Sequence, residues 1–181
     1  MIQVVPNTGS AASTPARRRA VVRMRPVARV YQFRSREDAS LAPHPATCAA
    51  SSFAPAVSLG AVLLPHDADT VDGEVTDGSP IGTATACLRF TDPKAPVGHA
   101  GKLFVAFDLP VGRVTAEGTI GVLSHDTAAR GAVVAACSLR VMSAPAGIRG
   151  GTAEGMGVFG AAESGDVPTG AFWTLRLYPD G

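Results

Sequence analysis

Apolar and polar residues alternate along most of the chain after residue 52. In residues 113–123, for example, Val114, Ala116, Ile120 and Val122 fall on one face and Arg113, Thr115, Glu117 and Thr119 on the other. A period of two predicts β-strands with one buried face. No comparable run shows the 3.6-residue apolar period of an amphipathic helix. The pattern therefore predicts an all-β protein.

Eight segments have this strand-like character: residues 25–35, 53–64, 81–90, 103–109, 113–123, 131–142, 156–163 and 171–178. The 20 glycines and 14 prolines fit short strands joined by turns. An open sheet of this size would leave an apolar face and two edges uncovered, and closure removes both. We predict a closed antiparallel barrel of about eight strands (calycin-type) with an apolar central cavity, because such a barrel can hold one small ligand. A two-sheet sandwich is the structural alternative.

The pattern also divides the chain into an N-terminal arm, residues 1–25, and a single barrel domain, residues 26–181. Residues 39–52 are expected to form a loop with a short helical turn, and residues 67–80 a long acidic connection. The Gly-rich stretch 145–157 is expected to lie between strands, where its glycines shape a tight barrel corner. The arm has a low-complexity, Arg-rich composition, and we expect it to be mobile.

Charge is unevenly distributed along the chain. Residues 1–36 contain eight arginines and no acid, whereas the other 145 residues contain eight bases and fifteen acids. A basic arm suits nucleic-acid or membrane attachment, or it is a solvated tail that docks on its own acidic body. The lack of interleaved aromatic residues favours the tail. No run approaches the roughly twenty apolar residues of a membrane helix, so we predict neither nucleic-acid nor membrane partners.

Composition suggests how the surface is used. Hydrophobic residues make up 46% of the chain and charged residues 17%, which is less charge than is usual for a soluble protein. This favours a homo-oligomer (a dimer or trimer), an apolar ligand, or both. Heavy use of Ala, Gly, Val, Pro and Arg, with two lysines, is typical of a GC-rich bacterial genome. We therefore predict a location in the bacterial cytoplasm.

The cysteines, Cys48, Cys87 and Cys137, are odd in number and lack metal-ligand spacing. Cys87 and Cys137 lie within strand-like runs and are predicted to be small buried hydrophobic residues. We expect neither a disulfide framework nor a structural zinc site.

Other candidate chemical groups are sparse. Residues 66–69 read His-Asp-Ala-Asp, with more acids up to Asp77, but they lack the distal carboxylate of an EF-hand. A hydrated acidic loop is the simpler interpretation, and we predict no metal. Gly150, Gly151 and Thr152 lack the lysine and helix of a phosphate-binding loop. No nucleophile elbow or cysteine signature is present.

Glu117 is the most informative polar residue, because it falls in the middle of a predicted strand, two residues from Thr115. A carboxylate facing the barrel lumen would be costly to bury unless paired, and could then act as acid or base. A carboxylate facing solvent would be an ordinary surface charge. Glu117 and Thr115 are therefore the candidate catalytic residues, with their strand parity left open.

Three segments together resemble the allene oxide cyclase-like barrel family. They are residues 81–90, which begin Ile-Gly-Thr; residues 109–118, Leu-Pro-Val-Gly-Arg-Val-Thr-Ala-Glu-Gly; and residues 148–152, Ile-Arg-Gly-Gly-Thr. The resemblance covers roughly residues 58–178. Cys87 stands where a glycine is common, and the segment after Thr152 lacks the usual aromatic residue. The family includes plant allene oxide cyclases, dirigent proteins and bacterial spirotetronate cyclases.

The resemblance implies a commonly oligomeric barrel with a hydrophobic cavity and no cofactor. It implies a cyclase of bacterial polyketide biosynthesis that folds an apolar polyene-type substrate, with an intramolecular [4+2] cycloaddition as one candidate reaction. Holding the reacting ends together would lower the entropic part of the barrier. The alternatives are a non-catalytic hydrophobic-ligand-binding barrel and a dirigent-like stereochemical guide. The predicted substrate-lining residues, which could equally be core, are Tyr31, Leu88, Phe90, Leu103, Phe107, Leu139, Met156 and Trp173.

Overall fold

The structure, a computed structural model, describes residues 28–43, 45–66, 70–71, 74–75, 78–92, 94–125, 133–159 and 169–180. The proposed arm, residues 1–25, lies outside the described residues. The elements are β1 (Arg29–Glu37), α1 (Pro45–Cys48), β2 (Val57–Pro65), β3 (Thr70–Val71), β4 (Glu74–Val75), β5 (Gly82–Phe90), β6 (Ala100–Leu109), β7 (Gly112–His125), β8 (Val133–Ser143), β9 (Ile148–Phe159) and β10 (Gly170–Pro179).

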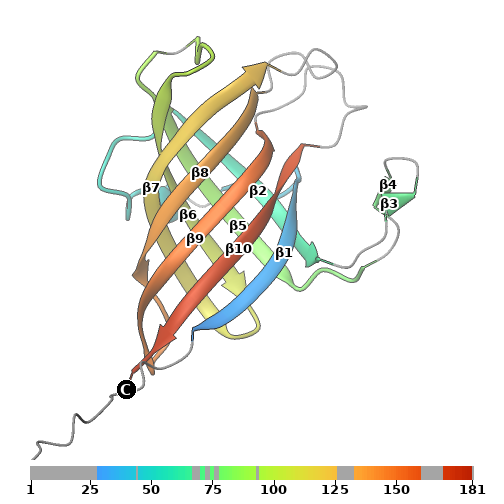
Figure 1. The fold of residues 1–181 in the computed structure, drawn as a ribbon, viewed down its shortest axis with the longest axis vertical. Helices are drawn as coiled ribbons and strands as arrows, with labels where there is room; N and C mark the ends of the chain where they lie inside the picture. Colours follow the sequence, from blue (N-terminus) through green and yellow to red (C-terminus); the bar gives the residue numbers. More distant parts are fainter. Residues whose placement is uncertain are drawn as a thin grey trace, which may run out of the picture.

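Eight strands close into one antiparallel barrel in the order β1-β10-β9-β8-β7-β6-β5-β2 (Figure 1). β1 closes the ring by pairing with β10 on one side and β2 on the other. The predicted closed barrel is confirmed, and the two-sheet sandwich is wrong. β3 and β4 pair with each other as a separate hairpin in the connection from β2 to β5. Among the described residues, no helix combines the length and apolar composition needed to cross a lipid bilayer.

The two ends of the barrel differ in their connections. Short turns join β6 to β7 and β8 to β9 at the end where the chain also finishes, labelled C in Figure 1. We call this the short-turn end. The opposite end carries the β1–β2, β5–β6, β7–β8 and β9–β10 connections, and we call it the long-loop end. Residues 126–132 and 160–168, in two of these connections, lie outside the described residues.

Strand alternation separates an interior face from an outer face, as the sequence pattern predicts. In β6, Leu103, Val105 and Phe107 belong to the large buried cluster inside the barrel. Phe104 and Ala106, one residue out of step, belong to a second, smaller cluster. Because successive side chains in a strand point to opposite faces, this second cluster lies on the outer wall.

The second cluster is covered by the β1–β2 loop, which we define as residues 38–56. The members of this cluster, Phe104, Ala106 and Cys87, are buried, and Cys48 and Phe53 of the loop pack against them. α1 is the short helical turn expected within this loop, and the expectation is confirmed. The loop is therefore a folded layer on the outside of β5 and β6.

β9 corrects the prediction for the Gly-rich stretch. Residues 145–157 were expected to lie between strands, but β9 begins at Ile148 and pairs with both β8 and β10. A Cβ atom at Gly151 would overlap the backbone carbonyl of Arg176, and one at Gly157 would overlap that of Gly170. The glycines thus let β9 and β10 approach closely, which is a strand role rather than a turn role. Residues 160–163 of the expected strand lie outside the described residues.

Candidate functional site

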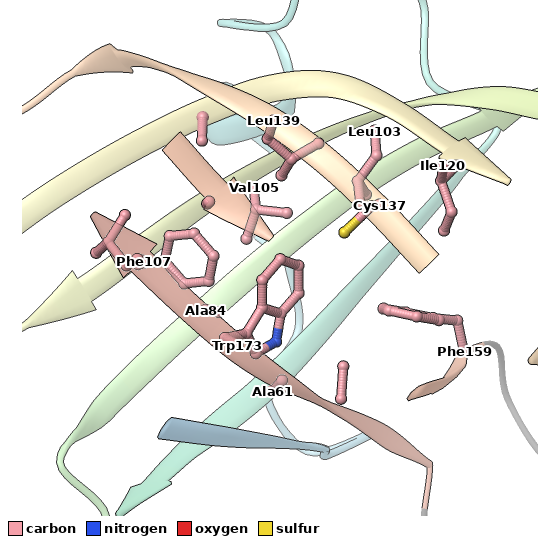
Figure 2. Close-up of a cluster of buried hydrophobic side chains, with 14 of the residues drawn as sticks. Ala61, Ala84, Leu103, Val105, Phe107, Ile120, Cys137, Leu139, Phe159 and Trp173 are labelled. Carbon is pink, nitrogen blue, oxygen red and sulfur yellow. The ribbon is translucent and has the colours of Figure 1, made fainter. Parts of the chain in front are cut away.

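Aromatic rings fill the middle of the barrel interior. The rings of Phe107 and Trp173 meet edge to face with centroids 5.1 Å apart, and Phe33 contacts Phe107 in the same way at 5.5 Å. Phe159, at the long-loop end of β9, lies 6.4 Å from Trp173, also edge to face. Figure 2 shows Trp173 between Phe107 and Phe159, with the sulfur of Cys137 near its ring. At this level, large side chains occupy the interior.

Trp173 fits because its neighbour on β9 is Gly155, which is its register partner. A Cβ atom at Gly155 would lie 2.7 Å from Cζ3 of Trp173 and 3.0 Å from Sγ of Cys137. Real Cβ atoms do not come so close to a ring carbon, so the space over Gly155 is taken by the indole. The glycine in the strand thus sets the position of the largest interior side chain.

A row of small residues lies next to Trp173 on the side of the long-loop end. Ser35 on β1 pairs with Ala171 on β10, Ala171 pairs with Gly157 on β9, and Gly157 pairs with Ala135 on β8. All four lie at the interior positions of their strands, and Ala135 and Ala171 are buried members of the interior cluster. We call these four residues the small row. It lines one wall of the interior between Trp173 and the long-loop end.

Ser35 is the polar residue of this wall. Its Oγ accepts hydrogen bonds from Nε1 of Trp173 (3.0 Å) and from the backbone N–H of Ala171 (3.1 Å). The indole N–H is thereby satisfied, as a buried donor requires. Ser35 shares its strand parity with Tyr31, which was predicted to line the interior, so the alternation of residues 31–35 could have placed Ser35 on the inner face.

Glu37 lies two residues further along β1, at the long-loop rim. Its Oε2 accepts a hydrogen bond from Oγ1 of Thr169 (2.7 Å), and its backbone N–H donates to the Thr169 carbonyl (2.8 Å). Thr169 is buried, with 8% of its surface exposed. Strand alternation from Phe33 and Ser35 puts Glu37 on the inward face.

Cys137 is a free, buried thiol on the interior face of β8. Burial away from water raises its pKa to about 12, because the thiolate would lose its hydration. A thiol held neutral in this way is not a nucleophile at physiological pH. The prediction that Cys137 is a small buried hydrophobic residue is confirmed.

Most of the predicted substrate-lining residues do lie on the interior face. Leu88, Leu103, Phe107, Leu139 and Trp173 are buried in the interior cluster, and Tyr31 and Phe90 pack against it while partly exposed. Met156 does not join them, and its placement was wrong. It lies on the outer face of β9 with 57% of its surface exposed, since its neighbour Gly155 takes the interior position beside Trp173.

Thr115 and Glu117 lie on the outer face of β7. They alternate with Val114 and Ala116, which point into the interior. The Glu117 carboxylate accepts hydrogen bonds from the backbone N–H of Ser52 (2.8 Å) and from the Ser52 hydroxyl. It therefore fastens the β1–β2 loop to the barrel wall. Neither residue is brought to the interior wall that carries Trp173 and the small row.

A disulfide joins Cys48 of α1 to Cys87 of β5, with the two Cα atoms 5.7 Å apart. The expectation that no disulfide forms was wrong, as was the prediction that Cys87 is only a small buried hydrophobic residue. The two cysteines are 39 residues apart, and only the fold of the loop over β5 brings them together. A signal was present: Cys87 alternates with Thr85 and Arg89 on the polar face of its strand.

The histidines do not converge on a metal site. Among the described residues, no group of three or more His, Cys, Asp or Glu side chains could hold an ion. His66 is exposed at the end of β2, where its ring meets Phe172 edge to face with centroids 6.2 Å apart. His44, Asp67, Asp69, Asp72 and Asp77 lie outside the described residues.

Comparisons of the chain with protein-family models, with curated proteins and with solved structures returned no match. The likeness to the allene oxide cyclase-like family therefore rests on the three sequence motifs and stays a hypothesis.

Proposed function

We propose that the protein is a cofactor-independent cyclase of bacterial natural-product biosynthesis that folds an apolar, polyene-type substrate inside the barrel. The observation that carries this proposal is the small row beside Trp173. Ser35, Ala171, Gly157 and Ala135 form one interior row of small residues, with Trp173 on one side of the row and Phe159 toward the long-loop end. An apolar wall with few polar handles is the usual form of a site for an apolar small molecule.

The chemistry of the wall suits a reaction driven by shape. A flexible polyene loses much of its entropic barrier when its reacting carbons are held together, and an intramolecular [4+2] cycloaddition needs no proton transfer. The hydroxyl of Ser35 and the indole N–H of Trp173 are hydrogen-bonded to each other, so a polar group of the substrate would have to replace this bond in order to be oriented by them. The Glu37 carboxylate, at the rim, could bind a hydroxyl that remains near the mouth.

A non-catalytic barrel that binds a hydrophobic ligand is the second candidate. It is favoured by the scarcity of acid–base groups on the described part of this wall. The Cys137 thiol is held neutral by burial, and the predicted catalytic pair Glu117 and Thr115 lies outside the barrel. A cyclase that works by shape and a binding protein differ only in turnover, so both must be measured.

Binding can be measured through Trp173, because the chain has one tryptophan. cis-Parinaric acid, a conjugated polyene, should quench Trp173 emission as it enters the interior. Ala135→Leu and Ala171→Leu, which fill the small row, should weaken this binding at least tenfold, while both variants keep a cooperative thermal transition. Ala136→Leu, on the outer face of the same strand, is the matched control and should leave binding unchanged.

Turnover is tested with synthetic linear polyene precursors that carry a tethered diene and dienophile. The proposal expects ring formation faster than the background rate, and loss of this acceleration in Ala135→Leu. Polyene binding without any acceleration would support the binding barrel instead. If cis-parinaric acid binds equally to the wild type and to both filled variants, the interior site is not where the ligand binds and both functions fail.

A further inference from the structure

A hollow lies on the outside of the barrel, between the β1–β2 loop and the outer faces of β5, β6 and β7. Its volume is about 870 Å³, which is in the range of small-molecule sites. The loop side contributes small side chains, among them Ala42, Ala46 and Ala50, which keep the space open. We call it the outer groove. It faces away from the interior and shares no wall with the small row.

The barrel side of the outer groove carries two rows of polar side chains set by the strand register. Thr83 on β5 pairs with Asp108 on β6, and Asp108 pairs with Arg113 on β7. In the adjacent row, Thr115 on β7 pairs with Ser143 on β8. All of these side chains line the groove. Neighbouring strands are about 4.8 Å apart, so the hydroxyl, carboxylate and guanidinium groups form a closely spaced array.

The charges in this array balance. Nε of Arg113 lies 3.4 Å from Oδ1 of Asp108, and both side chains are about half exposed. Nη2 of Arg113 donates a hydrogen bond to Oγ1 of Thr47 in the loop (3.1 Å). A guanidinium has five N–H donors, and Nη1 makes no hydrogen bond to any residue that the structure describes. The pair thus offers a free donor and a free carboxylate oxygen with no net charge.

The groove keeps its shape because the loop is fastened at several points. The Cys48–Cys87 disulfide, the two hydrogen bonds from Ser52 to Glu117, and the contact between Thr47 and Arg113 all tie the loop to the barrel. Arg89 adds a hydrogen bond to the Ala54 carbonyl (3.1 Å). A site held in place before binding loses less conformational entropy when a ligand arrives.

We propose that the outer groove binds a neutral, hydroxyl-rich small molecule of the saccharide class. Ligand hydroxyls can donate to the Asp108 carboxylate, accept from the free N–H groups of Arg113, and pair with Thr115 in either direction. An anion bound to the free N–H groups of Arg113 would be repelled by the adjacent Asp108 carboxylate, and a cation bound to Asp108 would be repelled by Arg113. An apolar ligand would leave the hydroxyls unpaired, which is unfavourable in a buried contact.

Isotope-edited NMR of the oxidised full-length chain tests this proposal. A panel of neutral methyl glycosides and disaccharides is titrated, with glucuronate and glucosamine as charged analogues. At least one neutral member should shift the amide signals of Thr85 and Thr115 with a saturating dissociation constant, and the charged analogues should bind at least tenfold more weakly. No saturable shift with any neutral member would overturn the proposal, as would equal binding of glucuronate.

Matched variants locate the site. Thr115→Val removes one neutral hydrogen bond and should weaken saccharide binding about fivefold. Asp108→Asn removes one charge-assisted hydrogen bond and should weaken it about tenfold. Thr119→Val, on the same face of β7 but outside the groove, should bind like the wild type. Equal affinity in Thr115→Val and Thr119→Val would place any saccharide elsewhere and contradict the proposal. Quenching of Trp173 emission by the polyene is measured on the same samples. A lack of saccharide binding together with normal polyene quenching would overturn the groove proposal and leave the proposed function standing.

Discussion

Gly155 and Trp173 show how a single position sets the packing of the barrel interior. Gly155→Ala would put a methyl group 2.7 Å from the Trp173 ring and 3.0 Å from the Cys137 sulfur. Because these neighbours are buried, we expect a loss of about 1–3 kcal/mol in the free energy of unfolding, measured by urea titration. Gly121→Ala is the control, since nothing lies within 4 Å of its Cβ position. Equal urea midpoints for the two variants would contradict this role of Gly155.

Ser35 is predicted to stabilise the interior through its hydroxyl. Ser35→Ala removes the acceptor for the Trp173 indole and the Ala171 amide, and an unsatisfied buried donor costs about 1–3 kcal/mol. A lower thermal midpoint and an altered Trp173 emission maximum should report the loss. Ser138→Ala, at an exposed position on β8, should change neither. If the emission of Ser35→Ala matches that of the wild type, the hydrogen bond does not form in solution.

Cys137 should make stability depend on alkaline pH. Its thiol pKa is raised by burial from 9.0 to about 12. The unfolded chain therefore loses this proton at lower pH than the folded chain, so the stabilisation is complete below about pH 9 and is lost as pH rises toward 12. Urea midpoints at pH 8 and pH 10.5 should fall more in the wild type than in Cys137→Ala. Parallel losses in the two proteins would contradict the shift.

The β1–β2 loop is the element whose stability depends most on one bond. The Cys48–Cys87 disulfide closes a 39-residue separation, and chain-entropy reasoning gives about 4 kcal/mol for such a loop. In Cys48→Ala/Cys87→Ala, we expect lower stability and faster amide hydrogen exchange in residues 45–56, with the interior strands still protected. Wild type in reductant should behave in the same way. Unchanged exchange in the loop would show that its hydrogen bonds alone hold it.

The same disulfide bears on where the protein works. Bacterial cytoplasm keeps thiols reduced, whereas disulfides persist in oxidising compartments. A disulfide is therefore unexpected in a protein of the bacterial cytoplasm, which is the location that the sequence composition suggests. Mass spectrometry of protein alkylated in denaturant at the moment of cell lysis would decide the matter: one alkylated cysteine indicates the disulfide, and three indicate reduced cysteines.

A strand could be predicted from the sequence where its own residues show the apolar alternation of a strand. β5, β6 and β10 were predicted to within a few residues, because large apolar residues recur at every second position, as Leu103, Val105 and Phe107 do in β6. β9 was placed too late, since glycines have no side chain to show alternation, and Met156 was assigned to the wrong face. The sequence shows Cys87 on the polar face of its strand, but its pairing with Cys48 could not be predicted, and neither could the Glu117–Ser52 contact, because both depend on how residues 38–56 fold over distant strands.

At the scale of the whole molecule, closure of the barrel separates two surfaces that never meet. The interior carries Trp173, Ser35 and the small row, and the outer wall carries the loop, the disulfide and the outer groove. A residue's strand parity decides which surface it serves. Thr115 and Glu117 were selected for their place in the chain, and their parity assigns them to the outer surface.

Glu117→Gln tests this separation. The amide replaces one carboxylate oxygen by an N–H donor and removes the negative charge, so the two bonds from Ser52 lose their charge assistance and one must reverse direction. We therefore expect faster hydrogen exchange in residues 50–54. Polyene binding and cyclisation in the interior should stay within twofold of the wild type, because the closed wall of β7 lies between. Glu154→Gln, an outer-face carboxylate paired with Arg176, is the control and should alter neither reading. A tenfold loss of cyclisation in Glu117→Gln alone would return this carboxylate to the reaction and contradict its purely external role.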